Sequence, residues 1–463
     1  MDVRRQKFMV LGVSKSGEAV AEYLLKCGGQ VCIHDDNKGK KTEKTIEKLC
    51  ALGAVEVEEN ELMNTAINTD ILVLSPGVPI DHPLAVAFKR AKKSVVGETE
   101  IAARLFKGLS VAVTGTNGKT TTVSMIEKVL KDSGFHALAC GNIGTPMIGI
   151  MNEPADVVAV AEISSFQLET LNSLCPHIAV ILNVTEDHLN RHYNMENYIF
   201  LKRKLLKNLT ESEWAVLNYD DPIVRSFADG LKARVAWISL REQVDGAYFK
   251  DGELCYEKER ILSADQMLVS GAHNVYNALA AIACAKILGV ETELLAGSLQ
   301  GFKGIKHRVE GVGMVDGVTY VDDSKGTNVD ATLKAVECMK NETVLLLGGK
   351  DKGYDYHPLF AGLKRGKVVQ AILYGENRYS LLTAARAVGF EKLSVCPTFH
   401  EAVALARLVA RSGQTVLLSP ASASFDEFSG YEERGDRFCE FVRGLERNGS
   451  EKVASQPQCA DAE

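Results

Sequence analysis

Short, fully apolar runs alternate along the chain with stretches whose apolar residues recur every three or four positions. Near the start, the apolar runs 8–11, 31–33 and 71–74 end at Gly12, Asp35 and Ser75, and a helical pattern fills residues 17–26. Strands that are apolar on both faces and separated by helices are typical of a parallel sheet with helices on both sides. The pattern therefore predicts an α/β domain over residues 1–106.

The same alternation recurs twice more. We expect strands at 111–113, 157–161 and 178–182, helices at 122–131 and 277–288, and shorter strands within the more polar stretch 241–270. Further on, strands are expected at 318–321, 343–347, 371–374 and 415–418, with helices at 329–339 and 399–411. These patterns predict a central domain over 107–304 and a C-terminal α/β domain over 305–448. The polar, small-residue stretch 449–463 is predicted to be a disordered tail.

Composition and charge narrow the class of protein. The 463 residues are 46% hydrophobic and 24% charged, which is ordinary for a globular protein, and the formal net charge of −7 argues against a nucleic-acid binder. The 11 cysteines contain no CxxC pair and no zinc-ligand spacing. No secretory signal is present, and no apolar run reaches the roughly 18 residues that cross a bilayer. We therefore expect a cytoplasmic protein with reduced thiols and no membrane partner.

A glycine-rich loop, Gly115-Thr116-Asn117-Gly118-Lys119-Thr120, lies between a predicted buried strand and a predicted helix. Backbone N–H groups in such a loop surround phosphate oxygens, and the helix N-terminus adds partial positive charge. Lys119 is expected to reach the β- and γ-phosphates, and the hydroxyl of Thr120 is expected to bind Mg²⁺. The standard P-loop has a glycine six residues before the lysine, where this chain has Val113.

Two more strand ends favour a nucleotide site. The strand at 157–161 is followed by Glu162, and the strand at 178–182 is followed by Glu186, Asp187 and His188. Ligands of parallel sheets bind outside the carboxyl ends of the strands, so these side chains should converge on the glycine loop. Glu162 offers the hard oxygen that Mg²⁺ prefers. Among residues 186–188, the sequence alone does not choose the ligand.

The loops of the N-terminal and C-terminal domains give weaker evidence for a bound ligand. Gly12 to Gly17, together with Asp35, is similar to a dinucleotide-binding fingerprint, but Ser14 replaces the second glycine, which argues against NAD and leaves another phosphate-bearing ligand open. In the C-terminal domain, the loops 322–328, 348–353 and 419–426 are rich in lysine and small hydroxylated residues, which suits an anionic small molecule.

Taken together, these motifs resemble the Mur ligases over residues 5–447, and most of all the branch that adds D-glutamate. The shortened loop 115–120 is the form that this family uses. The segments typical of the D-glutamate-adding branch are 162–169, 183–188, 323–328 and 418–426, and 141–144 also matches. The resemblance implies an α/β fold of three domains: a Rossmann-like N-terminal domain for the UDP-sugar, a central P-loop-type mononucleotide-binding domain for ATP, and a Rossmann-like C-terminal domain for the amino acid.

The resemblance also implies an activity. It is the ATP-dependent ligation of D-glutamate to UDP-N-acetylmuramoyl-L-alanine through an acyl phosphate, in peptidoglycan precursor synthesis. Two Mg²⁺ sites and a monomeric enzyme are expected. The alternatives are another amide ligase of the superfamily, such as the L-alanine-adding or diaminopimelate-adding enzyme or folylpolyglutamate synthase, a P-loop GTPase or nucleotide-binding module, and an NAD-dependent oxidoreductase. The chain lacks the Asn-Lys-x-Asp motif of a GTPase, because Asn37-Lys38-Gly39-Lys40 has no aspartate.

The resemblance assigns roles residue by residue. The catalytic set is Lys119, Glu162, His188 and Lys202, of which Glu162, His188 and Lys202, together with Thr120, hold metal. The nucleotide-binding set is Gly115, Thr116, Asn117, Gly118, Lys119, Thr120, Thr121, Asn274, Asn277, Arg308 and Asp323. The substrate-binding set is Lys15, Ser16, Asp35, Ser75, Gly77, Asn142, Lys325, Thr327, Lys352, Ser424, Phe425 and Tyr431.

Two assignments depend on more than the motif. Lys202 corresponds to a lysine that is carbamylated in the family, whereas the residues alone, among Arg203, Lys204 and Lys207, predict an ordinary solvated helix lysine. Tyr431 stands where a phenylalanine is expected, and Lys350-Asp351 replaces an expected Asp-Gly. These two departures bear on the affinity for the amino acid.

Overall fold

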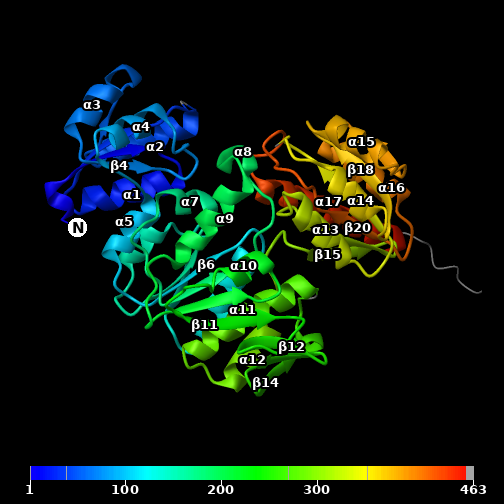
Figure 1. The fold of residues 1–463 in the computed structure, drawn as a ribbon. Coiled ribbons are helices and arrows are strands. Elements are labelled where there is room, and N and C mark those ends of the chain that lie inside the picture. The colour runs from blue at the N-terminus through cyan, green and yellow to red at the C-terminus, as the bar shows by residue number, and fades with distance from the viewer. Residues whose placement is uncertain (1, 38, 270, 352, 455–463) are drawn as a thin grey trace, which may run out of the picture. The chain divides into compact units, whose positions relative to one another are not determined.

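The computed structural model describes residues 2–37, 39–269, 271–351 and 353–454. The chain divides into two compact units, Met1–Phe302 and Lys303–Glu463. Two parallel or mostly parallel sheets lie in the first unit and one in the second (Figure 1). This confirms the predicted α/β architecture with three domains. Among the described residues, no helix is both long and apolar enough to cross a membrane.

The first sheet is fully parallel. Its strands, in sheet order, are β3 (Val55–Glu56), β2 (Gln30–His34), β1 (Lys7–Leu11), β4 (Ile71–Leu74) and β5 (Ser94–Gly97). Alternate residues of β1 face opposite cores: Phe8 and Val10 belong to one apolar cluster, and Met9 and Leu11 belong to another. The helices of this domain are α1 (Lys15–Lys26), α2 (Lys40–Ala51), α3 (Leu62–Asn68) and α4 (Pro83–Arg90).

The second sheet has the order β14-β13-β12-β11-β10-β9-β6-β8-β7. From β7 to β12 it is parallel, and β13 and β14 are antiparallel. The strands are β6 (Ser110–Thr114), β7 (Ala137–Gly141), β8 (Val158–Glu162), β9 (Ile178–Ile181), β10 (Trp214–Asn218), β11 (Arg234–Ser239), β12 (Gly246–Lys250), β13 (Glu253–Tyr256) and β14 (Glu259–Ser263). Because β6 lies between β8 and β9, the loops after these three strands are neighbours at one edge.

Helices separate and follow the strands of the central domain. They are α6 (Lys119–Asp132), α7 (Ser165–Thr170), α8 (Leu189–His192), α9 (Met195–Arg203), α10 (Pro222–Ser226), α11 (Ala272–Ile287) and α12 (Thr292–Gln300). Residues 278–285 of α11, most of which are small, are all buried, and α11 packs against α6. Small side chains allow the two helix backbones to approach closely, so α11 brings its polar first turn next to the glycine loop.

The third sheet, in the second unit, has the order β15-β16-β20-β17-β18-β19 and is parallel except for β15. Its strands are β15 (Glu310–Val315), β16 (Val318–Asp322), β17 (Thr343–Gly348), β18 (Val368–Tyr374), β19 (Leu393–Val395) and β20 (Thr415–Leu418). Its helices are α13 (Val329–Glu337), α14 (His357–Leu363), α15 (Arg378–Ala387), α16 (Phe399–Val409) and α17 (Tyr431–Ala454).

Helix α17 corrects one expectation. It continues to Ala454 and so covers the first six residues of the stretch 449–463, for which disorder is predicted. No proline interrupts the chain before Pro457, so the helix that begins at Tyr431 meets no residue that must end it. Residues 455–463 lie outside the described residues.

Helix α5 (Glu98–Leu105) joins the first two domains through two buried glutamates with different surroundings. Glu98 accepts hydrogen bonds from the backbone N–H of Ile148 at 2.5 Å and from the hydroxyl of Thr99 at 3.1 Å, and burial raises its pKa from 4.5 to about 7. Burial also opposes ionisation of Glu100, but four donors, from Asn172, Ser173 and Arg104, lower its pKa overall.

Glu98→Gln is expected to stabilise the protein above pH 7 and to leave it unchanged below pH 4.5. Below pH 4.5 the wild-type carboxyl is protonated in both the folded and the unfolded chain. As the pH rises to about 7, only the unfolded chain ionises, so folding loses up to roughly 3 kcal/mol. A glutamine avoids this loss and can still accept from the Ile148 N–H. Urea unfolding at pH 4.5 and pH 8 measures the effect.

The matched control is Glu100→Gln. Because the pKa of Glu100 is lowered, its ionised form stabilises the fold at neutral pH, and the same substitution there is expected to destabilise. If both variants change stability in the same direction at pH 8, the assignment of the neutral form to Glu98 is wrong.

Candidate active site

The loop between β6 and α6 requires glycine at two positions. Gly115 and Gly118 have φ of 154° and 87°, and a Cβ on Gly118 would lie 2.4 Å from the side-chain oxygen of Asn277. Asn183 fixes the loop, because its side-chain oxygen accepts from the N–H of Asn117 at 2.9 Å and its backbone oxygen accepts from the N–H of Thr116 at 3.0 Å. The first-turn N–H groups of α6 have no intrahelical partner, which makes this loop suited to phosphate.

Three polar side chains follow the loop in the first turn of α6. The Nζ atom of Lys119 donates to the backbone oxygens of Gly115 at 3.0 Å and Thr116 at 2.7 Å, so the lysine folds back over the loop. Thr120 and Thr121 are buried, and the hydroxyl of Thr121 is buried without a hydrogen-bond partner in the part of the chain that the structure describes. The predicted phosphate-binding residues are therefore together at one helix N-terminus.

Glu162 is the last residue of β8, which pairs with β6, and its side chain is buried near the glycine loop that follows β6. Its Oε1 atom accepts from the side-chain amide of Asn142 at 2.7 Å, while its Oε2 atom is buried and has no hydrogen-bond partner among the described residues. A buried carboxylate oxygen without a partner is costly unless a cation or a water binds it. Glu162 therefore fits the role of a ligand for Mg²⁺, which prefers such hard oxygen atoms.

Lys202 is 1% exposed, which contradicts its interpretation as a solvated helix lysine. Its Nζ atom donates to the backbone oxygen of Gly115 at 2.8 Å and to the hydroxyl of Thr114 at 3.2 Å. Burial, and then the charge of Lys119, holds the pKa of Lys202 well below its usual value. The sequence pattern misled because Lys202 shares the buried face of α9 with Tyr198, whereas Arg203 is exposed and Lys204 and Lys207 lie beyond the end of the helix.

The three candidate ligands after β9, residues 186–188, differ in their burial. Glu186 is exposed, Asp187 is buried, and His188 is half-buried with a left-handed φ of 56°. The carboxylate of Asp187 lies 3.5 Å from the Nε2 atom of His188 and acts electrostatically on Lys202, as does Glu162. Asp187 thus belongs to the charge cluster around Lys202, whereas Glu186 does not, a difference that no feature of the sequence predicts.

Two asparagines on α11, both predicted to contact the nucleotide, lie in the central domain. Asn274 and Asn277 are both buried. The side-chain oxygen of Asn277 accepts from the hydroxyl of Thr122 at 3.2 Å, and its amide donates to Asn274 at 3.3 Å. The side chain of Asn277 therefore lies beside Gly118, and that of Asn274 is bonded to it.

In the first domain, several predicted substrate contacts hold the loops themselves. The Asp35 carboxylate accepts from the N–H of Val13 at 2.7 Å, and the buried hydroxyl of Ser75 donates to the backbone oxygen of Gly12 at 2.6 Å. Lys15 donates to the backbone oxygen of Gly144 at 2.5 Å, next to the loop that contains Asn142. Ser16 is half-buried and Gly77 is exposed. These residues bring the loops after β1, β2 and β4 together.

In the second unit, Arg434 joins the three loops that the sequence predicts to bind an anion. It is 0% exposed. Its guanidinium donates to the hydroxyl and backbone oxygen of Ser324 at 3.0 and 2.9 Å, and to the backbone oxygens of Gly348, Ser422 and Ala423 at 3.1–3.4 Å. Arg434 was not predicted as a site residue, because the helix around it contains many exposed charges.

The predicted residues of the second unit lie around these loops. The backbone oxygen of Tyr431 accepts from the hydroxyl of Ser324 at 2.8 Å, and the Nζ atom of Lys325 lies 5.1 Å from the centre of the Tyr431 ring. Ser424 is buried, Thr327 is half-buried and Phe425 is 69% exposed. Lys352 lies outside the described residues.

Arg308 and Asp323 form the nucleotide-binding pair expected in the second unit. Burial raises the pKa of Asp323 to about 7, although Ser419, which donates to it at 2.6 Å, and the charge of Arg308 lower it. The Nε atom of Arg308 is buried and has no hydrogen-bond partner among the described residues. An unpartnered donor next to a carboxyl that is only partly ionised fits a polar ligand such as a nucleotide hydroxyl or phosphate.

Comparison with known families finds three consecutive matches. Residues 6–97 match the Mur ligase MurD-like N-terminal domain, residues 113–285 match the Mur ligase middle domain, and residues 307–422 match the Mur ligase glutamate ligase domain. The matches follow the three sheets of the structure and together span most of the chain.

Curated relatives are similar over nearly their whole length. A UDP-N-acetylmuramoylalanine--D-glutamate ligase from Pelotomaculum thermopropionicum is 43% identical over 454 residues, which are 96% of this chain and 99% of the relative. The ligase of that name from Clostridioides difficile is 36% identical over 451 residues, 96% of this chain and 100% of the relative. These matches favour the D-glutamate-adding branch over the other amide ligases, the GTPase and the oxidoreductase weighed above.

Solved structures share the fold at low sequence identity. UDP-N-acetylmuramate-alanine ligase MurC from Thermotoga maritima aligns with a TM-score of 0.61 at 18% identity, covering 95% of this chain and 100% of that protein. MurF from Acinetobacter baumannii aligns with a TM-score of 0.62 at 19% identity, covering 89% and 91%. At this identity the likeness concerns the fold alone.

Proposed function

The chain belongs to the Mur ligase family and is a D-glutamate-adding ligase of peptidoglycan precursor synthesis, and from this premise we propose how its residues divide the reaction. ATP binds with its phosphates at the loop Gly115–Thr120, and UDP-N-acetylmuramoyl-L-alanine binds to the first domain through the loops after β1, β2 and β4. D-Glutamate binds to the loops around Arg434. The observation that supports this most strongly is the cluster of charges at the phosphate loop, in which Glu162, Asp187 and Lys202 are buried and Lys119 is half-buried.

The first step transfers a phosphoryl group. The terminal carboxylate of the UDP-linked alanine attacks the γ-phosphorus of ATP, the bond to the bridging oxygen breaks, and an acyl phosphate and ADP result. The Nζ atom of Lys119 donates to two backbone oxygens of the loop. Once ATP binds, the same amine pairs with the β- and γ-phosphates in place of these oxygens. Such a transfer needs mainly alignment and neutralisation of charge, which the loop N–H groups and this lysine provide.

Four residues would hold two Mg²⁺ ions. Thr120 and Glu162 suit one ion, since the Oε2 atom of Glu162 is buried without a partner in the described part of the chain. His188 and Lys202 suit the other, provided that Lys202 is carbamylated. When bound, the ions neutralise negative charge on the transferred phosphoryl oxygens.

The surroundings of Lys202 favour carbamylation. Only the neutral amine attacks CO₂, and burial together with the charge of Lys119 favours that neutral form. The attack forms an N–C bond and releases one proton, which leaves an anionic carbamate in place of a cation. The carbamate would then lie among Lys119 and the metal ions, whose positive charges stabilise it. The modification therefore removes the unfavourable burial of the Lys202 cation beside a second lysine.

The second step forms the amide bond. The amine of D-glutamate attacks the acyl carbon, and the tetrahedral intermediate releases inorganic phosphate. Lys325, Thr327, Lys352, Ser424, Phe425 and Tyr431 form the amino-acid site. Arg308 and Asp323 contact the nucleotide. The cation at Lys325 and the hydroxyls of the loops match the two carboxylates of D-glutamate.

Amino-acid-dependent phosphate release tests this assignment. With ATP, Mg²⁺ and UDP-N-acetylmuramoyl-L-alanine present, we expect phosphate release with D-glutamate and background release with L-glutamate, L-alanine or diaminopimelate. No release above background with D-glutamate would overturn the proposal. Release with another amino acid would move the chain to a different branch of the superfamily.

A further inference from the structure

A short, strained segment lies between the substrate loop after β4 and the phosphate loop. Helix α8 has only four residues, and both neighbours, His188 and Tyr193, have left-handed φ values of 56° and 70°. Non-glycine residues adopt this conformation only when their surroundings hold them in it. Contacts that fix α8 therefore also fix the position of His188.

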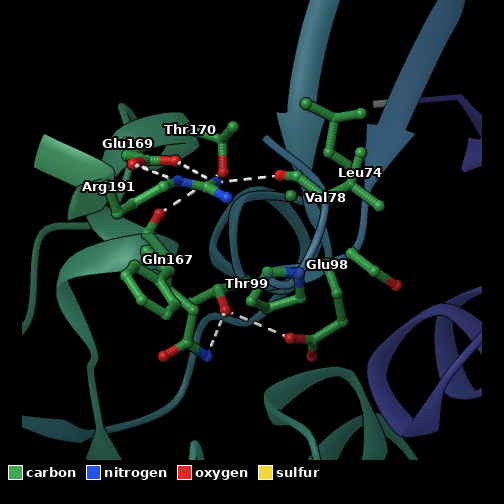
Figure 2. Close-up of a pocket in the computed structure, with 12 residues that line it drawn as sticks. Leu74, Val78, Glu98, Thr99, Gln167, Glu169, Thr170 and Arg191 are labelled. Carbon is green, nitrogen blue, oxygen red and sulfur yellow. Dashed lines mark hydrogen bonds and ion pairs between the residues drawn. The ribbon is translucent and has the colours of Figure 1, made fainter. Parts of the chain in front are cut away.

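Arg191 on α8 makes the strongest of these contacts (Figure 2). Its Nε and Nη2 atoms donate to the two carboxylate oxygens of Glu169 at 3.0 and 2.6 Å, and Nη2 also donates to the backbone oxygen of Val78 at 2.9 Å. The side chains of Arg191 and Glu169 are 15% and 7% exposed. Val78 belongs to the loop of Ser75 and Gly77, so Arg191 joins the central domain to the predicted UDP-sugar loop.

The ring of Phe166 lies between the guanidinium of Arg191 and the ring of His188 and contacts both. It lies 5.1 Å from the centre of the Phe166 ring, and the Phe166 ring centre lies 4.8 Å from that of His188. In addition, the backbone N–H of Arg191 donates to the backbone oxygen of His188 at 2.9 Å. Phe166, Glu169, Arg191, Ser75 and Val78 all line one narrow pocket between the two domains.

Glu169 extends the same network to the phosphate loop. Its Oε1 atom lies 3.4 Å from the Nδ1 atom of the buried His192. The ring of His192 stacks on Tyr198 at 5.4 Å, and the hydroxyl of Tyr198 lies 3.1 Å from that of Thr116. The contacts thus run without interruption from Val78 through Arg191 and Glu169 to the loop that we expect to bind ATP.

We propose that Arg191 is a positioning residue that couples the UDP-sugar loop to the metal-binding side chain of His188. Occupation of the loop at residues 75–78 fixes the Val78 carbonyl, which fixes Arg191 and, through Phe166, the ring of His188. This inference rests on the proposed function, because it requires that Ser75–Val78 contact the UDP-sugar and that His188 hold a metal ion.

The test compares Arg191→Ala and Arg191→Lys with Tyr193→Phe. Lysine keeps the charge but cannot span both Glu169 oxygens and the Val78 carbonyl while stacking on Phe166. Tyr193 is the matched control, because it also connects this segment to the first domain, by a hydrogen bond to Asp81 at 2.9 Å, but is 69% exposed and has no ring contact with Phe166 among the described contacts. Calorimetry measures binding of UDP-N-acetylmuramoyl-L-alanine, and EPR measures binding of Mn²⁺ with a non-hydrolysable ATP analogue.

Both Arg191 variants are expected to bind the UDP-sugar and Mn²⁺ about tenfold more weakly, with the KM for D-glutamate nearly unchanged. Arg191→Ala is also expected to lower the melting temperature, because it leaves the buried Glu169 carboxylate without its cation, whereas Arg191→Lys keeps the charge. Tyr193→Phe is expected to stay within about twofold for every quantity. Equal binding by wild type and both Arg191 variants, or an equal loss in Tyr193→Phe, would overturn the inference. If Arg191→Ala does not fold, Arg191→Lys and Glu169→Gln decide. Failure of the wild type to bind the UDP-sugar would instead overturn the proposed function.

Discussion

Replacing Lys202 with alanine is expected to lower kcat on the order of a thousandfold while the protein stays folded. The Lys202 Nζ atom is buried beside the phosphate loop, 2.8 Å from the backbone oxygen of Gly115, and acts on the same electrostatic cluster as Lys119, Glu162 and Asp187. In the proposed mechanism the carbamate of Lys202 is one ligand of a metal site and one of the charges that offset Lys119, and the alanine variant lacks it. Steady-state phosphate release, with a melting curve for each protein, measures this.

Addition of a short carboxylic acid separates the carbamate from a plain lysine. The space that the side chain leaves in Lys202→Ala can admit acetate or propionate, whose carboxylate replaces the carbamate. We expect the rate to rise with acid concentration and to saturate. If propylamine restores the rate and the acids do not, Lys202 acts as a cation and the carbamate proposal is wrong. Lys207→Ala, at an exposed lysine five residues further on, is the control and should keep the wild-type rate.

Much of the fold follows from local pattern. Strands β6, β8 and β9 are fully buried and have apolar central residues, so the sequence predicted these strands and the convergence of the loops that follow them. Strands β5 and β7 were not predicted, because each is a short run of small or half-buried residues at the side of its sheet. Their pairing depends on neighbours that are distant in sequence.

The site divides in a similar way. The phosphate loop could be predicted from six consecutive residues, because glycine, lysine and threonine have fixed tasks in such a loop. Lys202 could be assigned only by resemblance, since its burial depends on how α9 packs. Asp187 could not be told apart from Glu186, and Arg191 and Arg434 were not predicted, for a related reason: they act on residues of other elements, and a charged residue in a charged segment gives no local sign of being buried.

Arg434→Met is expected to destabilise the second unit by about 3–5 kcal/mol and to leave the first unit unchanged. Methionine is similar in volume but donates no hydrogen bond. The backbone oxygens of Ser324, Gly348, Ser422 and Ala423 would lose a common donor in a site that water does not reach. Because Arg434 donates to oxygens on three loops, its loss is expected to affect the proposed amino-acid site as well as the core.

The positions of the tryptophans allow the two units to be followed separately. The chain has two tryptophans, Trp214 on β10 and Trp237 on β11, and both lie in the first unit. Tryptophan fluorescence during urea unfolding therefore reports on the first unit, whereas far-UV circular dichroism reports on both. In Arg434→Met, the dichroism curve is expected to gain an early transition while the fluorescence midpoint stays at its wild-type value.

Arg437→Met is the matched control, because Arg437 lies on the same helix and is 60% exposed, with an ion pair to Glu440 at 3.0 Å. An exposed pair of this kind contributes little, so the change should stay within about 0.5 kcal/mol. Arg434→Lys should fall between the two, since an ammonium has fewer donors and cannot reach all three loops. An equal shift of the fluorescence and dichroism curves would mean that the two units unfold together. An unchanged dichroism curve would mean that Arg434 does not stabilise the loops, because the carbonyls would then have found other donors.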